Sequence, residues 1–137
     1  MTPDALAALH ARCFTMPRPW SAAEFAALLT SKGVFLKSTA AGFALGREIA
    51  GESELLTLAV DPALQRQGHG RSLLTAFEAE SRKRGATEAL LEVAATNSAA
   101  RNLYESAGYR ESGRRPRYYS PPQGKKTDAI LMRKSLI

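Results

Sequence analysis

Apolar residues recur along this chain with two different periods, and each period predicts a different element. Residues 3–14 carry apolar side chains at helical spacing with Asp4 in the first turn, which is typical of an amphipathic helix. After a proline-rich stretch, Ser21 and Glu24 have the spacing of a capping box, which predicts a second helix that ends near Gly33. The chain is therefore expected to begin with two helices.

Strand-like segments come next. Residues 34–38, 41–49 and 53–61 are rich in apolar residues and are separated by short polar or glycine-bearing turns. Runs of this length joined by such turns are typical of antiparallel hairpins. The middle of the chain is therefore expected to contribute three consecutive strands to one sheet.

The remainder alternates between the two periods. We expect a helix at 70–84, a strand at 87–94, a helix at 98–107, and strands at 109–116 and 127–134 joined by a loop at 121–124. Helices and strands in this order predict an α/β sandwich around a mixed sheet. A chain of 137 residues is long enough for one such domain, which we expect to span 1–137.

Composition narrows the class of protein. Hydrophobic residues make up 45% and charged residues 23% of the chain, as in a soluble globular protein. Its longest apolar runs are too short to cross a membrane, and the first residues show no signal peptide. Its single cysteine, Cys13, is interpreted as a small buried apolar residue and fits a reducing compartment. We expect a cytoplasmic protein without membrane association.

The net charge of +6 indicates an anionic partner but does not identify it. A nucleic acid, a ribosome surface and a phosphorylated cofactor all remain open. The basic and aromatic stretch 114–119 fits a nucleic-acid patch or a charged strand end, and we favour the strand end. His10 and His69 lie far apart, and no Cys/His spacing predicts a metal site.

The densest chemical signal is the turn Gln65-Arg66-Gln67-Gly68-His69-Gly70 between a strand that stops at Asp61-Pro62 and a helix. Glycines let the backbone approach a ligand closely, and the first N–H groups of a helix attract anions. Arg66 and Arg71 add positive charge. An ordinary glycine turn is the alternative, but the strand, turn and helix together favour a pyrophosphate site.

These segments resemble a known family. Val60-Asp61-Pro62 followed by Gln-x-x-Gly-x-Gly resembles the acetyl-coenzyme A motif of the GNAT N-acetyltransferases. Leu91-Glu92-Val93, Thr96-Asn97 and the segment 103–109 are similar to the ribosomal-protein-alanine acetyltransferases within that superfamily. The resemblance covers nearly the whole chain and implies the GNAT fold, a mixed and mostly antiparallel sheet of about six strands flanked by about four helices.

The resemblance also implies residue roles. The strand at Leu58 and Val60 would pair with the pantetheine arm, the N–H groups of 67–72 would hold the pyrophosphate, and Asn97 would contact the pantetheine. The residues implied in binding acetyl-coenzyme A are Leu58, Val60, Gln65, Arg66, Gln67, Gly68, His69, Gly70, Arg71, Ser72 and Asn97.

For the reaction, the resemblance makes Glu92 the general base, Tyr104 the general acid beside the sulfur, and Tyr118 and Tyr119 neighbours of the acceptor. From the pattern alone, Glu92 also fits a solvent-facing strand carboxylate, and Tyr104 also fits a core aromatic residue on a helix stripe. Freeing an α-amine at neutral pH costs about 1 kcal/mol and freeing a lysine amine roughly 4.6 kcal/mol, which favours an N-terminal acceptor.

The leading hypothesis is an acetyl-CoA-dependent N-acetyltransferase acting on a protein N-terminus, an alanine of a ribosomal protein. The alternatives are a GNAT enzyme for a small-molecule amine or a lysine, and a ribosome-associated domain that binds CoA without turnover. The sequence departs from the family at two places in the half that would bind the acceptor. Ala94 stands where the family usually has arginine, and Lys125-Lys126-Thr127-Asp128 stands where it often carries Arg-Glu-Asp.

Overall fold

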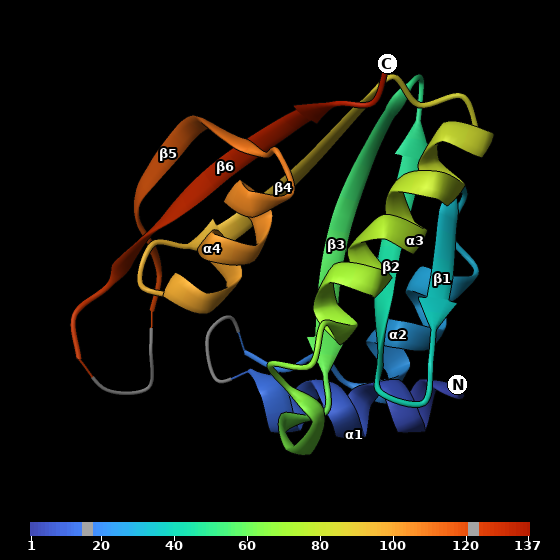
Figure 1. Ribbon diagram of the computed structural model, residues 1–137. Helices are drawn as coiled ribbons and strands as arrows, with labels where there is room; N and C mark the ends of the chain where they lie inside the picture. Colours follow the sequence, from blue (N-terminus) through green and yellow to red (C-terminus); the bar gives the residue numbers. More distant parts are fainter. Residues whose placement is uncertain (15–17, 121–123) are drawn as a thin grey trace.

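The computed structural model describes residues 1–14, 18–120 and 124–137, which form four α-helices and six strands (Figure 1). The helices are α1 (Pro3–Cys13), α2 (Ala22–Leu29), α3 (His69–Lys83) and α4 (Ser98–Ser106). The strands are β1 (Val34–Ser38), β2 (Gly42–Ile49), β3 (Glu52–Val60), β4 (Glu88–Ala94), β5 (Arg110–Tyr119) and β6 (Thr127–Ser135). Most of the loop predicted at 121–124 lies outside the described residues.

The strands form one six-stranded sheet in the order β1-β2-β3-β4-β6-β5. Within the described ranges, β3 and β4 are the parallel pair and the other neighbours run antiparallel. This arrangement confirms the mixed, mostly antiparallel sheet expected from the sequence. It also makes β3 and β4 the junction between an N-terminal hairpin half and a C-terminal half.

The pairing between β3 and β4 is short. Their register covers Glu52–Leu55 against Glu88–Leu91, although both strands continue beyond it. Figure 1 shows the two strands meeting at one end and diverging toward the other. Residues 57–60 therefore have partners in β2 on one side, while the edge of residues 56–60 toward β4 is left open.

Helices cover both faces of the sheet. On one face α3 packs on β1, β2 and β3, and Leu73, Leu74 and Phe77 are buried there, as the helical pattern predicted. On the other face α1 packs against β3 and α2 against β1, around Leu6 and Phe25. Each face thus has its own apolar core, and the sheet separates them.

Local sequence determines the ends of α2. Ser21 Oγ accepts from the Glu24 N–H at 3.1 Å and Glu24 accepts from the Ser21 N–H at 3.0 Å, so the predicted capping box is confirmed. The helix ends earlier than expected, at Leu29. Thr30 and Ser31 donate side-chain hydrogen bonds back to the carbonyl of Ala27, which satisfies a carbonyl of the last turn.

Among the described residues, no helix combines the length and the hydropathy that a membrane crossing requires.

Candidate functional site

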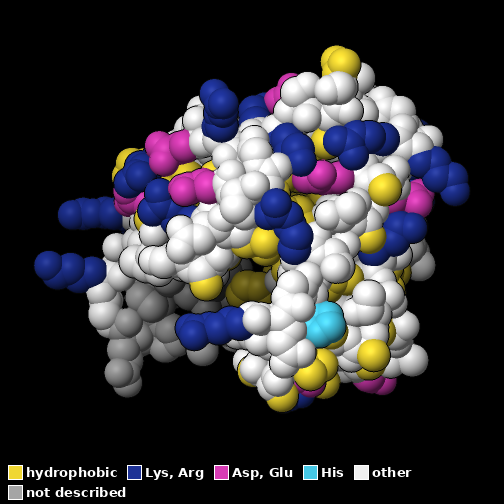
Figure 2. All heavy atoms as spheres, viewed as in Figure 1, with side chains coloured by type: hydrophobic (Ala, Val, Ile, Leu, Met, Phe, Trp, Pro, Cys, Tyr) yellow, Lys and Arg dark blue, Asp and Glu magenta, His cyan; other side chains and the backbone are white. Residues whose placement is uncertain are grey.

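A cavity of about 790 Å³ occupies the region where β3 and β4 diverge. Figure 2 shows the molecule hollowed there, with Lys and Arg side chains on either side of the hollow. Most of the residues predicted from the sequence line it. They are Leu58, Val60, Gln65, Arg66, Gly68, His69, Gly70, Arg71, Glu92, Asn97, Tyr104, Tyr118 and Tyr119. Gln67 and Ser72 do not line it.

A β-bulge determines which side chains of β3 face which side. Leu45 of β2 pairs with Thr57 and Gly46 pairs with Leu55, so Leu56 is an extra residue without a partner in β2. After the bulge, Leu58 packs with the core under α3, while Thr57 hydrogen-bonds to α1 on the opposite face. At the cavity, the side chains of Thr57 and Leu58 therefore lie on opposite faces of the sheet.

The turn before α3 has the backbone of an anion site. Gly68 caps the helix at φ +83° with no atom within 4 Å of a Cβ placed on it, and Arg66 also has a positive φ, of 64°. No hydrogen bond occupies the N–H groups of residues 67–71 within the described chain, whereas the Ser72 N–H donates to the Gly68 carbonyl at 3.1 Å. The open donors are therefore those of 67–71, and Ser72 closes the first helical turn instead.

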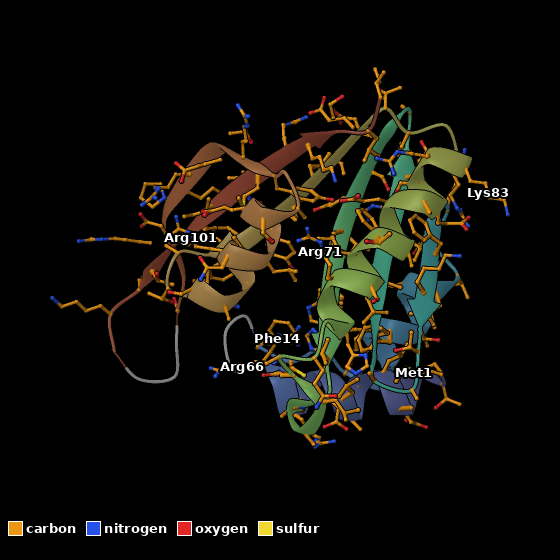
Figure 3. The ribbon with its side chains drawn as sticks, in the orientation of Figure 1. Met1, Phe14, Arg66, Arg71, Lys83 and Arg101 are labelled. Atoms are coloured by element: carbon orange, nitrogen blue, oxygen red, sulfur yellow. The ribbon has the colours of Figure 1, made fainter. Side chains whose placement is uncertain are left out.

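Two arginines flank this turn in different ways. Figure 3 shows Arg66 extending from the loop and Arg71 lying between α3 and α4. Arg71 donates to the hydroxyl of Ser106 at 2.7 Å and to the Ser106 carbonyl at 3.3 Å. Arg71 thereby ties the start of α3 to the end of α4 while its positive charge remains at the cavity.

The end of β3 is held by two side chains. The Val60 carbonyl accepts from Cys13 Sγ at 3.2 Å and from Gln65 Nε2 at 3.3 Å, so both of its lone pairs are used. Any backbone contact of Val60 with a ligand must therefore use another group. Cys13 is half-buried and lines the cavity, which corrects its interpretation as a small buried apolar residue. Burial raises the pKa of its thiol, which keeps it protonated as a donor.

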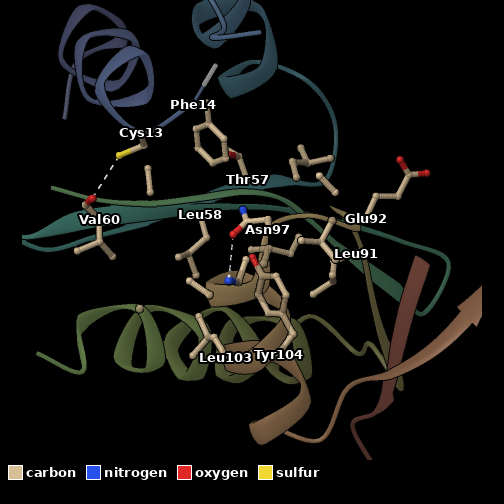
Figure 4. Close-up of a pocket in the computed structure, with 18 of the residues that line it drawn as sticks. Cys13, Phe14, Thr57, Leu58, Val60, Leu91, Glu92, Asn97, Leu103 and Tyr104 are labelled. Carbon is tan, nitrogen blue, oxygen red and sulfur yellow. Dashed lines mark hydrogen bonds between the residues drawn. The ribbon is translucent and has the colours of Figure 1, made fainter. Parts of the chain in front are cut away.

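Asn97, which precedes α4, and Tyr104 of α4 point toward the divergence of the strands (Figure 4). Asn97 caps the helix, since its Oδ1 accepts from the Ala100 N–H at 3.2 Å. Tyr104 is 8% exposed, and its hydroxyl has no hydrogen-bond partner among the described residues. Burial raises the pKa of Tyr104 to about 12. A protonated hydroxyl that faces the cavity without a protein partner is a donor available to a ligand.

Glu92 lies on the other side of the cavity. Leu91 and Val93 belong to the apolar core on the α3 side of the sheet. Alternation along β4 turns Glu92 to the opposite face, where its carboxylate pairs with Arg115 at 3.2 Å. Figure 4 shows this carboxylate pointing away from Tyr104. The Arg115 guanidinium also lies 5.2 Å from the Tyr118 ring centroid. Glu92 is therefore a partly exposed carboxylate in an ion pair beside aromatic side chains.

Two expectations from the sequence concern the surroundings of Glu92: the role of Tyr119 as a neighbour of the acceptor, and the character of the stretch 114–119. Burial and the nearby Glu92 charge raise the pKa of Tyr119 to about 12, so this predicted acceptor neighbour stays a neutral donor. Arg114 pairs with Asp128 at 3.2 Å and with Glu111 at 3.4 Å. Because these carboxylates offset much of the charge of the strand, the stretch 114–119 has the character of a charged strand end.

The most buried polar group of the site was not predicted from the sequence. His10 is 1% exposed and lines the cavity with Thr57, Phe14 and Trp20. Its ring stacks on Phe14 at 4.4 Å and on Trp20 at 5.1 Å between centroids. Burial lowers its pKa to about 4, so the ring is neutral. The available signal was the position of His10 four residues after Leu6 on the apolar face of α1.

Ala94 marks the departure noted in the sequence. It is 5% exposed, pairs with Ala129 of β6 and lines the cavity two residues after Glu92. A small residue at this position leaves space beside the strand end. Across the described ranges, no group of three or more His, Cys, Asp or Glu side chains has the arrangement of a metal site.

Comparisons with known proteins agree with this geometry. The model of the acetyltransferase (GNAT) family matches residues 4–109. An Escherichia coli protein named ribosomal protein bS18-alanine N-acetyltransferase is 39% identical over 135 residues, which cover 96% of this chain and 90% of that protein. A protein of the same name from Haemophilus ducreyi is 36% identical over 118 residues, which cover 83% of this chain and 81% of that protein.

Solved structures give the same result. The crystal structure of the ribosomal-protein-S18-alanine N-acetyltransferase from Escherichia coli matches with a TM-score of 0.86 and 35% identity, over 98% of this chain and 87% of that one. Ard1 from Thermoplasma volcanium matches with a TM-score of 0.82 over 100% of this chain and 95% of that one, and at 23% identity this likeness shows the fold.

Proposed function

This chain belongs to the acetyltransferase (GNAT) family, and we propose that it moves the acetyl group of acetyl-CoA to the N-terminal α-amine of a ribosomal protein, at an alanine, in the cytoplasm. The names of the similar proteins support this acceptor. The observation that carries the proposal is the cavity itself, which joins an anion-binding turn on one face of the sheet to Glu92 and Tyr119 on the other. Two substrates could meet where β3 and β4 diverge.

Acetyl-CoA fits the α3 side of this cavity. The N–H groups of 67–71 and the start of α3 suit a pyrophosphate, because several donors and the positive end of the helix dipole converge there. The open edge of β3 at 56–60 offers backbone partners to an amide-containing arm. Asn97 and Tyr104 would then lie near the thioester end.

The reaction we infer is a direct transfer. The neutral amine attacks the thioester carbonyl carbon, a C–N bond forms and the C–S bond breaks. The amine loses one proton and the sulfur leaves with the electron pair of the broken bond. We assign Glu92 to accept the amine proton, directly or through water, because it is a carboxylate on the acceptor face of the cavity.

Tyr104 would act on the sulfur mainly as a hydrogen-bond donor. Its pKa of about 12 lies well above the ordinary thiol value near 8.5. Complete proton transfer from this tyrosine to a thiolate would therefore cost about 5 kcal/mol, at 1.36 kcal/mol per unit. A hydrogen bond that strengthens as negative charge develops on the sulfur avoids that cost.

A peptide panel with labelled acetyl-CoA tests the proposal. An Ala-initiated peptide should be acetylated, whereas the same peptide with a blocked N-terminus should not. Peptides that offer only a lysine amine should react far more slowly, since freeing that amine costs roughly 4.6 kcal/mol at neutral pH. Preferential turnover of lysine-only peptides or of small amines would contradict the proposed acceptor. Absence of turnover with every amine, despite acetyl-CoA binding, would contradict the proposed enzyme.

A further inference from the structure

Both ring nitrogens of the buried His10 are engaged. The Trp20 backbone N–H donates to Nδ1 at 3.1 Å, and Nε2 lies 3.1 Å from the Thr57 hydroxyl oxygen. A backbone N–H can only donate, so Nδ1 is the acceptor and carries no hydrogen. In a neutral ring the proton then resides on Nε2, which makes His10 the donor to Thr57.

This tautomer determines what Thr57 can do. A hydroxyl has one hydrogen to donate, and the His10 N–H already occupies an acceptor position of the Thr57 oxygen. No other hydrogen bond of the Thr57 hydroxyl occurs among the described residues, and Thr57 lines the cavity. The hydroxyl hydrogen is therefore available to a ligand in the cavity.

The surroundings hold this pair in place. His10 is stacked between Phe14 and Trp20, and Phe25 meets its ring edge-on at 5.5 Å. Thr57 is 9% exposed and stands on the rigid part of β3 that pairs with Leu45 of β2. Because a buried strand and a buried ring already fix this donor, it loses little conformational entropy when it binds a ligand.

The ligand that reaches the Thr57 hydroxyl must be the acceptor substrate, on the α1 face of the sheet, and not acetyl-CoA. Thr57 faces α1, whereas its neighbour Leu58 faces the core under α3, where the anion-binding turn lies. In a peptide the first carbonyl is separated from the α-amine by a single carbon atom. Any α-amine that reaches the thioester thus brings a carbonyl oxygen beside it, while a lysine side-chain amine brings none.

We propose that Thr57 binds the acceptor by donating its hydroxyl hydrogen to the carbonyl oxygen of the first residue, and that His10 is the positioning residue that directs this hydroxyl. The assignment rests on the proposed N-terminal acetylation and deepens it. It gives the site a physical means of selecting α-amino acyl groups over amines that lack the carbonyl. A site that hydrogen-bonds a substrate group discriminates against analogues without it.

The first test pairs two substitutions with two peptides. Thr57→Val removes the hydroxyl and keeps the branched shape, whereas Thr57→Ser keeps the hydroxyl. The peptides are an Ala-initiated peptide and its analogue with the first carbonyl replaced by a thioamide, whose sulfur accepts hydrogen bonds poorly. With the normal peptide, Thr57→Val should lower kcat/KM about ten-fold, as expected for one hydrogen bond, and Thr57→Ser should stay within about two-fold.

The thioamide separates recognition from structure. It should be a poorer substrate for the wild type but should lose almost nothing further in Thr57→Val, because the hydrogen bond is already absent. Thermal stabilisation by acetyl-CoA should be the same in all three proteins, since Thr57 faces away from the CoA side. His10→Phe should reproduce the pattern of Thr57→Val, and the double variant should be no worse than either.

Each result has a defined reading. Equal losses on both peptides would show that Thr57 is structural, and wild-type kcat/KM in Thr57→Val would show that it does not contact the acceptor. Either result overturns the assignment while leaving N-terminal acetylation standing. If wild-type protein fails to acetylate the Ala-initiated peptide, the proposed function fails first and the assignment fails with it. If His10→Phe does not fold, the Thr57 variants still decide the contact.

Discussion

Replacing Tyr104 by phenylalanine should separate activity from stability. The ring is 8% exposed and packs edge-on against Tyr109 with centroids 6.0 Å apart, and phenylalanine preserves both features. The hydroxyl that is removed has no partner among the described residues, so no hydrogen bond within that part of the protein is lost. We therefore expect the free energy of unfolding to change by less than about 0.5 kcal/mol.

The effect on catalysis should be much larger. A hydrogen bond to a charged group contributes about 1.5–3 kcal/mol, which corresponds to a loss of roughly 10- to 150-fold in kcat. Because this bond strengthens as charge develops on the sulfur, binding of acetyl-CoA in the ground state should change little. The rate can be followed by thiol release, and binding by the thermal shift that acetyl-CoA produces.

Tyr109 provides the matched control. Its hydroxyl donates to the buried carboxylate of Glu78 at 2.9 Å, and it does not line the cavity. Tyr109→Phe should therefore lower stability by about 1–3 kcal/mol while leaving the kcat of the folded enzyme unchanged. If Tyr104→Phe keeps the kcat of the wild type, or loses stability as Tyr109→Phe does, Tyr104 is a core residue and its catalytic assignment is wrong.

Three further outcomes are expected. Glu92→Gln should lower kcat/KM at neutral pH by about 10²-fold or more and lose less near pH 9, where an α-amine is already neutral; a pH-independent defect would exclude the base. The depressed pKa of His10, about 4 against 6.5 unfolded, gives stability that is present above pH 6.5 and is lost as pH falls toward 4. Urea unfolding should show a loss of about 2–3 kcal/mol over that range, which a His10→Phe protein should lack. Lys134→Met leaves the buried Glu78 without its cation at 2.9 Å and should destabilise by roughly 3 kcal/mol in the same assay; no change would show that the pair contributes nothing.

Elements determined by local sequence were predictable. The capping box of α2, the apolar stripe of α3 and the succession of helices and strands along the chain follow from residues that are close to each other in sequence. The bulge at Leu56 and the short register between β3 and β4 do not, because they depend on the pairing of segments that are distant in sequence. The pattern of residues 53–61 predicts a regular strand and contains no glycine or proline to mark the bulge.

In the candidate site too, features set by local sequence could be predicted, and contacts between distant segments could not. The turn at 65–70 is one contiguous segment, so the positive φ of Gly68 and the open N–H groups could be expected from its glycines, whereas the positive φ of Arg66 could not. The contact between His10 and Thr57 spans 47 residues, and the pair of Glu92 with Arg115 joins two strands that are not neighbours in the sheet. Spacing in the sequence carries no information about such contacts, so neither could be predicted without the fold.

The bulge gives a physical reason why one strand can serve two substrates. In a regular strand, Leu55 and Thr57 would face the same side, and the buried Leu55 would place Thr57 in the core under α3. The extra residue reverses this, so that Thr57 meets His10 while Leu58 stays on the side of the anion-binding turn. Because β3 has also left β4 by this point, both faces open into the same cavity. Deleting Leu56 removes the bulge but makes Thr57 the direct neighbour of Leu55, so alternation keeps Thr57 on the α1 side and acceptor turnover should persist in the folded variant. Loss of turnover in a folded variant that still binds acetyl-CoA would refute this account of the site.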